Sequence, residues 1–144
     1  MSWIPEHLRT VTPRLVVADG LDAIGFYRDA FGAELVDEPF VGPDGEVVHA
    51  EIRIGDSVVM LTEERPPGGA PPAQPTAIMA TYWPDVDAAW ARALAAGADV
   101  LFPLEDQFYG ERGGRVRDPF GQQWMMSQRT ETLAHDEIVR RSGA

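Results

Sequence analysis

The 144-residue chain contains no cysteine and only three histidines. This absence excludes disulfides, thiolate metal sites and a cysteine nucleophile, and it leaves little from which to build a structural zinc site. Basic residues are also few: 12 Lys and Arg stand against 23 Asp and Glu, giving a formal net charge of −11. The chain lacks the basic stripe that binds nucleic acid or an anionic membrane surface, so we expect neither partner.

Long hydrophobic runs are missing as well. No stretch approaches the roughly 20 apolar residues of a membrane span, and the N-terminus has no apolar segment of signal-peptide length. We therefore expect a cytoplasmic protein with one domain over residues 1–144. Residues 65–75 are rich in proline and glycine and predict a linker. This linker separates residues 9–64 from residues 76–130, and a tail over 131–144 follows.

The two halves have the same pattern. Apolar residues recur at i, i+3, i+4, i+7 and i+8 from Ala23 and again from Val86, an offset of 63, which predicts one amphipathic helix in each half. Asp19 or Asp22 is the expected N-cap of the first helix, and Asp85 that of the second. Gly32 and Gly97, 65 residues apart, are the expected C-caps. The change of offset predicts a second helix about two residues longer than the first.

Each half also ends in a predicted hairpin. Val48, Ala50, Ile52 and Ile54 alternate with polar residues, and Gly55 then turns the chain into an apolar strand. In the second half, residues 118–121 (Asp-Pro-Phe-Gly) form the expected turn. The pattern predicts an α+β fold of two tandem β-α-β-β-β modules, whose sheets curve around a cup-shaped cavity.

Four segments carry a resemblance to a known family: residues 22–34, 49–57, 85–99 and 109–121. Together they resemble the vicinal oxygen chelate superfamily, which contains glyoxalase I, bleomycin-resistance proteins and extradiol dioxygenases. The PhnB-like glyoxalase/bleomycin-resistance proteins are the most similar group. The resemblance implies the duplicated fold and a homodimer. It does not imply one activity, because the superfamily holds both enzymes and drug binders.

The resemblance also shows where metal ligands would lie, on the first and last strands of each module. The residues there are 12–17, 58–62, 78–82 and 122–127, and none is a carboxylate or an imidazole. Met60 stands where a metal-binding relative has glutamate, with Met125 or Met126 as its counterpart. Divalent ions need oxygen or imidazole ligands, so we expect no metal and no other cofactor.

The candidate site residues are mostly aromatic, sulfur-containing or charged. The segment 106–115, expected to be a loop, combines aromatic and charged residues with three glycines. Glu111 and His49 are candidate proton-transfer groups. Arg14, beside a metal-ligand position of the relatives, either faces water or anchors an acidic ligand. The candidate ligand-binding residues are Arg14, Met60, Tyr82, Phe108, Tyr109, Arg112, Gln122 and Trp124.

Three functions fit this reading. The first is a metal-independent protein that sequesters a planar, aromatic or antibiotic-like small molecule in an aromatic cup. The second is a metal-independent lyase, isomerase or cyclase, in which Glu111, His49 or Tyr109 moves protons and Arg112 or Arg14 stabilises an oxyanion. The third is a metalloenzyme of the glyoxalase or dioxygenase type. The sequence does not separate a binder from an enzyme.

Overall fold

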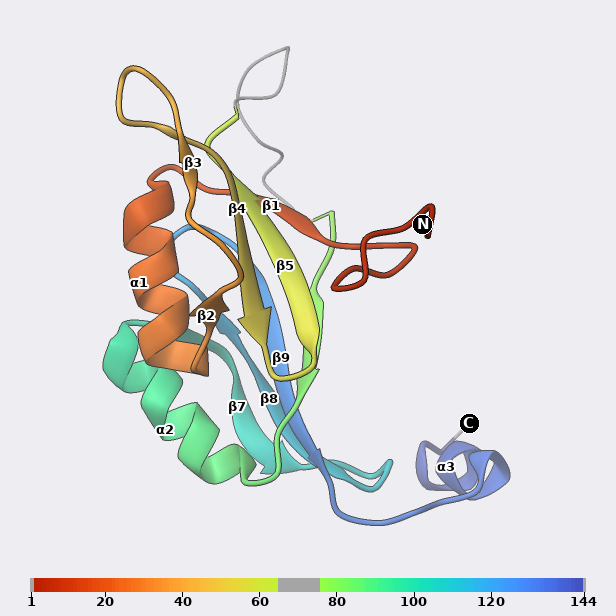
Figure 1. The fold of residues 1–144 in the computed structure, drawn as a ribbon. Helices are drawn as coiled ribbons and strands as arrows, with labels where there is room; N and C mark the ends of the chain where they lie inside the picture. Colours follow the sequence, from red (N-terminus) through yellow and green to blue (C-terminus); the bar gives the residue numbers. More distant parts are fainter. Residues whose placement is uncertain (1, 65–75, 144) are drawn as a thin grey trace. The chain divides into compact units, whose positions relative to one another are not determined.

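The computed structural model describes residues 2–64 and 76–143, which belong to two compact units, Met1–Ala73 and Gln74–Ala144 (Figure 1). Each unit contains one long helix and one mixed sheet. The predicted linker over 65–75 lies outside the described residues. The α+β class and the two tandem modules are confirmed.

The first unit contains a five-stranded sheet beside helix α1 (Gly20–Phe31). Its main strand order is β1-β5-β4-β2, and the short β3 pairs with β4. β1 runs parallel to β5, while β4 is antiparallel to β5 and β2. The strands are β1 (Arg14–Val16), β2 (Glu34–Leu35), β3 (Phe40–Val41), β4 (Val47–Ile54) and β5 (Ser57–Thr62).

The second unit repeats this arrangement with four strands in the order β6-β9-β8-β7. β6 is parallel to β9, and the other neighbours are antiparallel. Helix α2 (Val86–Ala96) packs against the sheet, and a short helix α3 (His135–Arg141) lies within the predicted tail. The strands are β6 (Met79–Tyr82), β7 (Asp99–Asp106), β8 (Glu111–Arg117) and β9 (Gln123–Arg129).

The helix caps lie where the sequence places them. Asp19 accepts the backbone N–H of Asp22, Asp85 accepts that of Ala88, and Gly32 and Gly97 have left-handed backbones. The predicted helix lengths are wrong: α1 has 12 residues and α2 has 11. The N-caps are 66 residues apart, whereas the apolar stripes of the two helices suggest an offset of 63. A stripe with spacings of three and four residues matches itself again after a shift of three, so the stripes alone do not fix how the two helices align.

The predicted alternation along β4 is correct only in part. Ala50 and Ile52 face the core, but Val48 is exposed and Val47 is fully buried in its place. The pairing of β3 with β4 shifts register beside this point, between Phe40 and Val41. The shift moves the side-chain pattern by one residue, as a β-bulge does.

The segment 106–115 is mostly not a loop. The chain turns over residues 107–110, and Glu111 already begins β8. Gly113 and Gly114 therefore lie inside a strand. A Cβ on Gly114 would come within 2.7 Å of the Trp90 ring, so this glycine allows β8 to pack closely against α2. In the part of the chain that the structure describes, no helix is long and apolar enough to cross a membrane.

Candidate functional site

Each sheet has one side that packs against its helix and one side that does not. In the first unit, Leu15, Ala50, Ile52 and Leu61 form the buried helix side. Their strand neighbours alternate to the other side, which we call the first open face. Along it, Arg14 is paired with Met60, and Met60 with Glu51. The first open face therefore carries Arg14, Met60, His49, Glu51 and Arg53.

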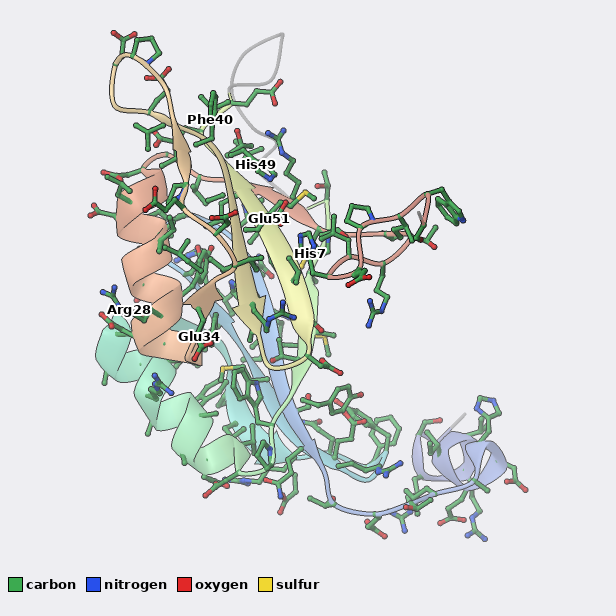
Figure 2. The ribbon with its side chains drawn as sticks, viewed as in Figure 1. His7, Arg28, Glu34, Phe40, His49 and Glu51 are labelled. Atoms are coloured by element: carbon green, nitrogen blue, oxygen red, sulfur yellow. The ribbon has the colours of Figure 1, made fainter. Side chains whose placement is uncertain are left out.

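Two histidines converge on one carboxylate of this face (Figure 2). His7 Nε2 lies 2.6 Å from Glu51 Oε1, and His49 Nε2 lies 2.8 Å from Glu51 Oε2. The hydrogen bond from His49 is the main cause that holds the pKa of Glu51 below its ordinary value, and His7 acts in the same direction. Glu51 is therefore ionised at neutral pH and binds an imidazole with each oxygen.

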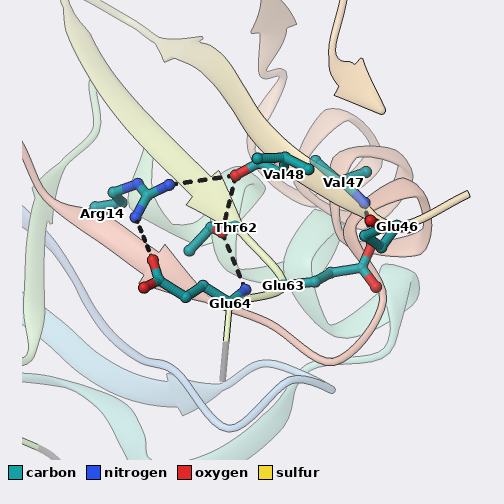
Figure 3. A pocket seen from close by; sticks show the side chains of 7 residues that line it. All are labelled: Arg14, Glu46, Val47, Val48, Thr62, Glu63 and Glu64. Carbon is teal, nitrogen blue, oxygen red and sulfur yellow. Dashed lines mark hydrogen bonds and ion pairs between the residues drawn. The ribbon is translucent and has the colours of Figure 1, made fainter. Parts of the chain in front are cut away.

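Arg14 lies at the border of a pocket of about 180 Å³ (Figure 3). Its guanidinium donates to Glu64 at 2.9 Å and to the carbonyl of Val48 at 3.2 Å. The positive charge of Arg14 is therefore paired within the first unit. Glu63, also in the pocket lining, accepts the backbone N–H groups of Val47 and Gly20. Gly20 begins α1, so this carboxylate stabilises the N-terminus of the helix.

The second open face lies opposite α2. Tyr82 on β6 is paired with Ser127 on β9, and Ser127 with Gly113 on β8, so the two positions that follow Tyr82 across the sheet have a small side chain and none. The Tyr82 hydroxyl donates to Glu111 Oε2 at 2.9 Å, and Tyr82 is 65% exposed. A phenol and a carboxylate thus come together at the end of β6 and the start of β8.

Two further aromatic residues continue this surface from the turn before β8. Phe108 and Tyr109 meet edge to face with ring centres 5.2 Å apart, and Phe108 is 47% exposed. The pKa of Tyr82 is raised first by its hydrogen bond to Glu111, and that of Tyr109 first by burial and then by the charge of Glu111. Both hydroxyls therefore keep their protons at neutral pH.

Arg112 lies apart from this group. It donates to Asp87 on α2 at 2.9 and 3.1 Å and approaches Asp106 at 3.4 Å. Since successive side chains of a strand alternate, Arg112 is on the helix side, whereas Glu111 is on the open face. Its pairing with Asp87 raises the pKa of Arg112 and lowers that of Asp87. The candidate residues Arg112 and Glu111, neighbours in the sequence, therefore lie on opposite sides of the sheet.

Trp124 and Gln122 are also removed from the exposed aromatic group. Trp124 is 1% exposed on the helix side, where its indole N–H donates to Asp118 at 2.9 Å. Gln122 is half-buried in the turn before β9, and its backbone N–H donates to the same carboxylate. Both residues organise the β8–β9 connection through Asp118.

Sequence reasoning missed two features of the open faces. His7 reaches Glu51 across 44 positions of sequence, and no local pattern links the irregular N-terminal lead to β4. Arg115 lies with its guanidinium 5.0 Å from the ring centre of Phe102, and among the described residues its buried Nε has no hydrogen-bond partner. The alternation of β4 did place His49 and Glu51 on one side, and this signal could have identified their contact.

Comparison with known proteins identifies the family. The model of the glyoxalase/bleomycin resistance protein/dioxygenase superfamily matches residues 6–126, most of the chain. The chain belongs to this superfamily. An uncharacterised protein of Mycobacterium bovis, Mb0911c, is 43% identical over 136 residues, covering 89% of this chain and 88% of its own.

Two solved structures of the superfamily's fold are similar as well. TioX from Micromonospora sp. ML1 is 26% identical with a TM-score of 0.65, covering 88% of this chain and all of its own. A Bacillus cereus PhnB protein described as a putative 3-demethylubiquinone-9 3-methyltransferase is 20% identical with a TM-score of 0.64, covering 83% and 99%. The second likeness shows the fold alone. The predicted resemblance to PhnB-like proteins is confirmed.

The superfamily includes metalloenzymes, but the donors in this chain do not fit a divalent ion at the expected strand positions. Arg14 and Met60 face one another across β1 and β5, and Ala80 and Met125 do so across β6 and β9. A guanidinium and thioethers are poor ligands for a hard ion. Over residues 2–64 and 76–143, no group of three or more His, Asp or Glu side chains is arranged to hold a metal.

Proposed function

We propose that this protein binds a small planar organic molecule, aromatic and neutral or cationic, on its second open face and without a metal. The observation that carries this proposal is the exposed Tyr82 ring, hydrogen-bonded to Glu111 beside Phe108 and Tyr109. An antibiotic-like planar compound has the required chemistry.

The arrangement suits such a ligand for two reasons. Aromatic rings offer flat apolar area and attract cations to their faces, so Tyr82 and Phe108 supply contact surface. Glu111 supplies a negative charge that already accepts one hydrogen bond and has room for a second donor. A planar cation satisfies both, whereas a planar anion meets repulsion from Glu111 and from the net charge of −11.

Calorimetric titration with a planar cationic dye tests the proposal. The wild-type protein should bind the dye saturably, and Tyr82→Ala should weaken binding about tenfold through the loss of aromatic contact. Glu111→Gln should weaken the cationic dye more than a neutral dye of the same shape, because only the charge is removed. Trp3→Ala is the matched control, since Trp3 is 85% exposed on the other unit and should not affect binding.

Two results would contradict this assignment. One is a Tyr82→Ala protein that binds as tightly as wild type. The other is the absence of saturable binding for cationic and neutral dyes alike. The variants should fold normally because Tyr82 is largely exposed, and circular dichroism spectra check this directly.

Proton transfer on the same face is a second candidate function, favoured by the bond between Tyr82 and Glu111. A phenol that keeps its proton and a carboxylate that accepts one form a pair of acid and base. A lyase, isomerase or cyclase would change the bound compound chemically, which mass spectrometry after incubation detects. Glu111→Gln would then stop the conversion, whereas a pure binder returns its ligand unaltered.

Homodimer formation stays a prediction.

A further inference from the structure

The His7–Glu51–His49 cluster lies on the first open face, in the first unit, whereas the residues of the proposed function belong to the second unit. We propose that His49 is a general base, positioned by Glu51, which removes a proton from a small planar carbon acid placed against Phe40 and Met60. The site belongs entirely to the first unit and does not depend on Tyr82 or Glu111.

The hydrogen bonds define which nitrogen is the base. An ionised carboxylate only accepts hydrogen bonds, so His7 and His49 each donate Nε2–H to Glu51 when neutral. The proton of His49 is therefore on Nε2, and its Nδ1 carries a lone pair. Neither histidine has a further hydrogen bond or ion pair with the described residues. The Nδ1 of His49 is thus left available to accept a proton.

Glu51 stabilises the product of that proton transfer. An imidazolium at His49 would lie 2.8 Å from a carboxylate oxygen, an arrangement that favours the protonated base. His7 binds the other oxygen at 2.6 Å and so restrains the carboxylate from rotating. Glu51 is the less exposed partner, with 19% of its side chain exposed against 37% for His49. The base is open to a ligand, while the positioning group is shielded.

The neighbours of this pair are apolar and suit a flat substrate. Phe40 is paired directly with His49 across β3 and β4, so both side chains lie on the same face, and its ring is 66% exposed. Met60 is paired with Glu51 on the other side. Figure 2 shows Phe40, His49, Glu51 and His7 following one another along the face. An aromatic ring and a thioether provide adaptable contacts for a planar heteroaromatic compound.

A 5-nitrobenzisoxazole probe tests the proposal with a balanced reaction. His49 Nδ1 takes the proton from C3 of the probe, and the C3–H electron pair forms the nitrile as the ring N–O bond breaks. The oxygen leaves as a coloured phenolate, and the imidazolium returns its proton to water. No oxidant or co-reactant is needed, and absorbance follows the product.

The expected outcome is a wild-type rate that His49→Gln lowers by about a hundredfold, at the lower end of the range of general-base catalysis. Glutamine keeps an N–H that can donate to Glu51, so the variant retains the contact and loses only the base. His7→Gln should lower the rate less, because it removes no base beside Phe40. His135→Gln, in the exposed α3, is the control and should leave the rate unchanged.

The balance of kcat and KM separates a positioning role of Glu51 from a structural one. Glu51→Gln should lower kcat for the probe while KM stays nearly constant, because the amide lacks the negative charge that stabilises the imidazolium but leaves Phe40 and Met60 in place. Glu34→Gln, on the neighbouring strand β2, is the matched control and should change neither constant.

Either of two results overturns the proposal: a rate that His49→Gln leaves unchanged, or a kcat that Glu51→Gln does not lower. The absence of conversion by wild type above the His49→Gln background has the same meaning. Dye binding is tested with Tyr82→Ala and probe conversion with His49→Gln, so failure of the dye-binding proposal and failure of this one are distinguishable.

Discussion

The two sheets carry opposite charges at equivalent positions of their open faces. Ile52 and Val116 are equivalent, because both are buried on the helix side and pair with a buried residue of the next strand. The residues just before them are Glu51 in the first unit and Arg115 in the second. Each is paired with a methionine, Met60 or Met125. The duplicated frame therefore keeps the methionine and changes the charge.

The surroundings of the two charged groups differ in the same way. Glu51 binds two imidazoles, whereas Arg115 lies over the ring of Phe102 and makes one long contact with Gln123 at 3.4 Å. Helix-side residues must fill an apolar volume against α1 or α2, which restricts them in both units. Open-face residues carry no such restriction, so chemical differences between the modules gather there.

The largest expected difference in stability between the two units concerns their hairpin turns. Asp118 is 3% exposed and accepts the backbone N–H groups of Phe120 and Gln122 and the indole N–H of Trp124, all at 2.9 Å. Asp118→Ala leaves three donors without their acceptor, and we expect a loss of about 3 kcal/mol in unfolding free energy. Denaturant unfolding followed by circular dichroism measures it.

The matched substitution in the first unit is Asp56→Ala. Asp56 is exposed in the tight turn between β4 and β5, where it accepts the Ser57 hydroxyl at 3.0 Å. We expect a change within about 0.5 kcal/mol, as for most surface substitutions. Equal losses at the two aspartates would refute the claim that only the second hairpin depends on a buried carboxylate.

A smaller difference is expected where the helices approach their sheets. Gly114 and Ala50 occupy equivalent helix-side positions, but a Cβ on Gly114 would lie 2.7 Å from the Trp90 ring and 2.8 Å from the Phe102 carbonyl oxygen. Gly114→Ala should therefore destabilise the protein by about 1–3 kcal/mol through overpacking. Ala50→Gly removes a methyl group that fits and should cost about 1 kcal/mol. Urea unfolding of both variants decides the order, and a Gly114→Ala protein as stable as wild type contradicts the packing argument.

The sequence predicts the elements that local patterns define. Asp85 and Gly97 mark the ends of α2 because capping depends on residues within one turn of the helix. The length of α1 is mistaken because an amphipathic stripe matches itself after three residues, so periodicity alone cannot set the register between the halves. The caps at Asp19 and Gly32 give the correct alignment, since each occurs once per helix.

The candidate site is predicted less well, for physical reasons that its residues make plain. Tyr82 and Glu111 are 29 positions apart, and their contact depends on the pairing of β6, β9 and β8. Arg112 was named because a guanidinium can bind an anion or a carbonyl, and the expected loop gave no side to its neighbours. In the strand β8, successive side chains alternate, so Arg112 and Glu111 point to opposite sides. Trp124 is apolar enough for either a core or a ligand surface, and only its burial decides between them.

The carboxylate of the first open face should make stability depend on pH. The folded-state pKa of Glu51 lies below its ordinary value of 4.5, so its stabilising contribution is present above that value and is lost as the pH falls through the lowered pKa. Glu51→Gln should flatten the dependence of unfolding free energy on pH below about 4.5, while Glu34→Gln should not. Because Glu51 retains solvent access, the effect is modest. Identical acid curves for wild type and Glu51→Gln would show that the two imidazoles add no stability.

The smallest expected effect belongs to the phenol of the second open face. The pKa of Tyr82 is raised above 10.0, mainly by its hydrogen bond to Glu111, so the neutral phenol stabilises the folded state below pH 10 and this contribution is lost as the pH rises through the raised pKa. Glu111→Gln should let Tyr82 ionise at lower pH, seen as an earlier rise in phenolate absorbance at alkaline pH. Tyr82→Phe identifies which part of the absorbance belongs to this residue, and Glu105→Gln is the control for removing a carboxylate elsewhere on the sheet. An unchanged titration in Glu111→Gln would mean that the Tyr82 hydroxyl bonds mainly to water. The Tyr82–Glu111 hydrogen bond would then no longer support the proposed binding surface.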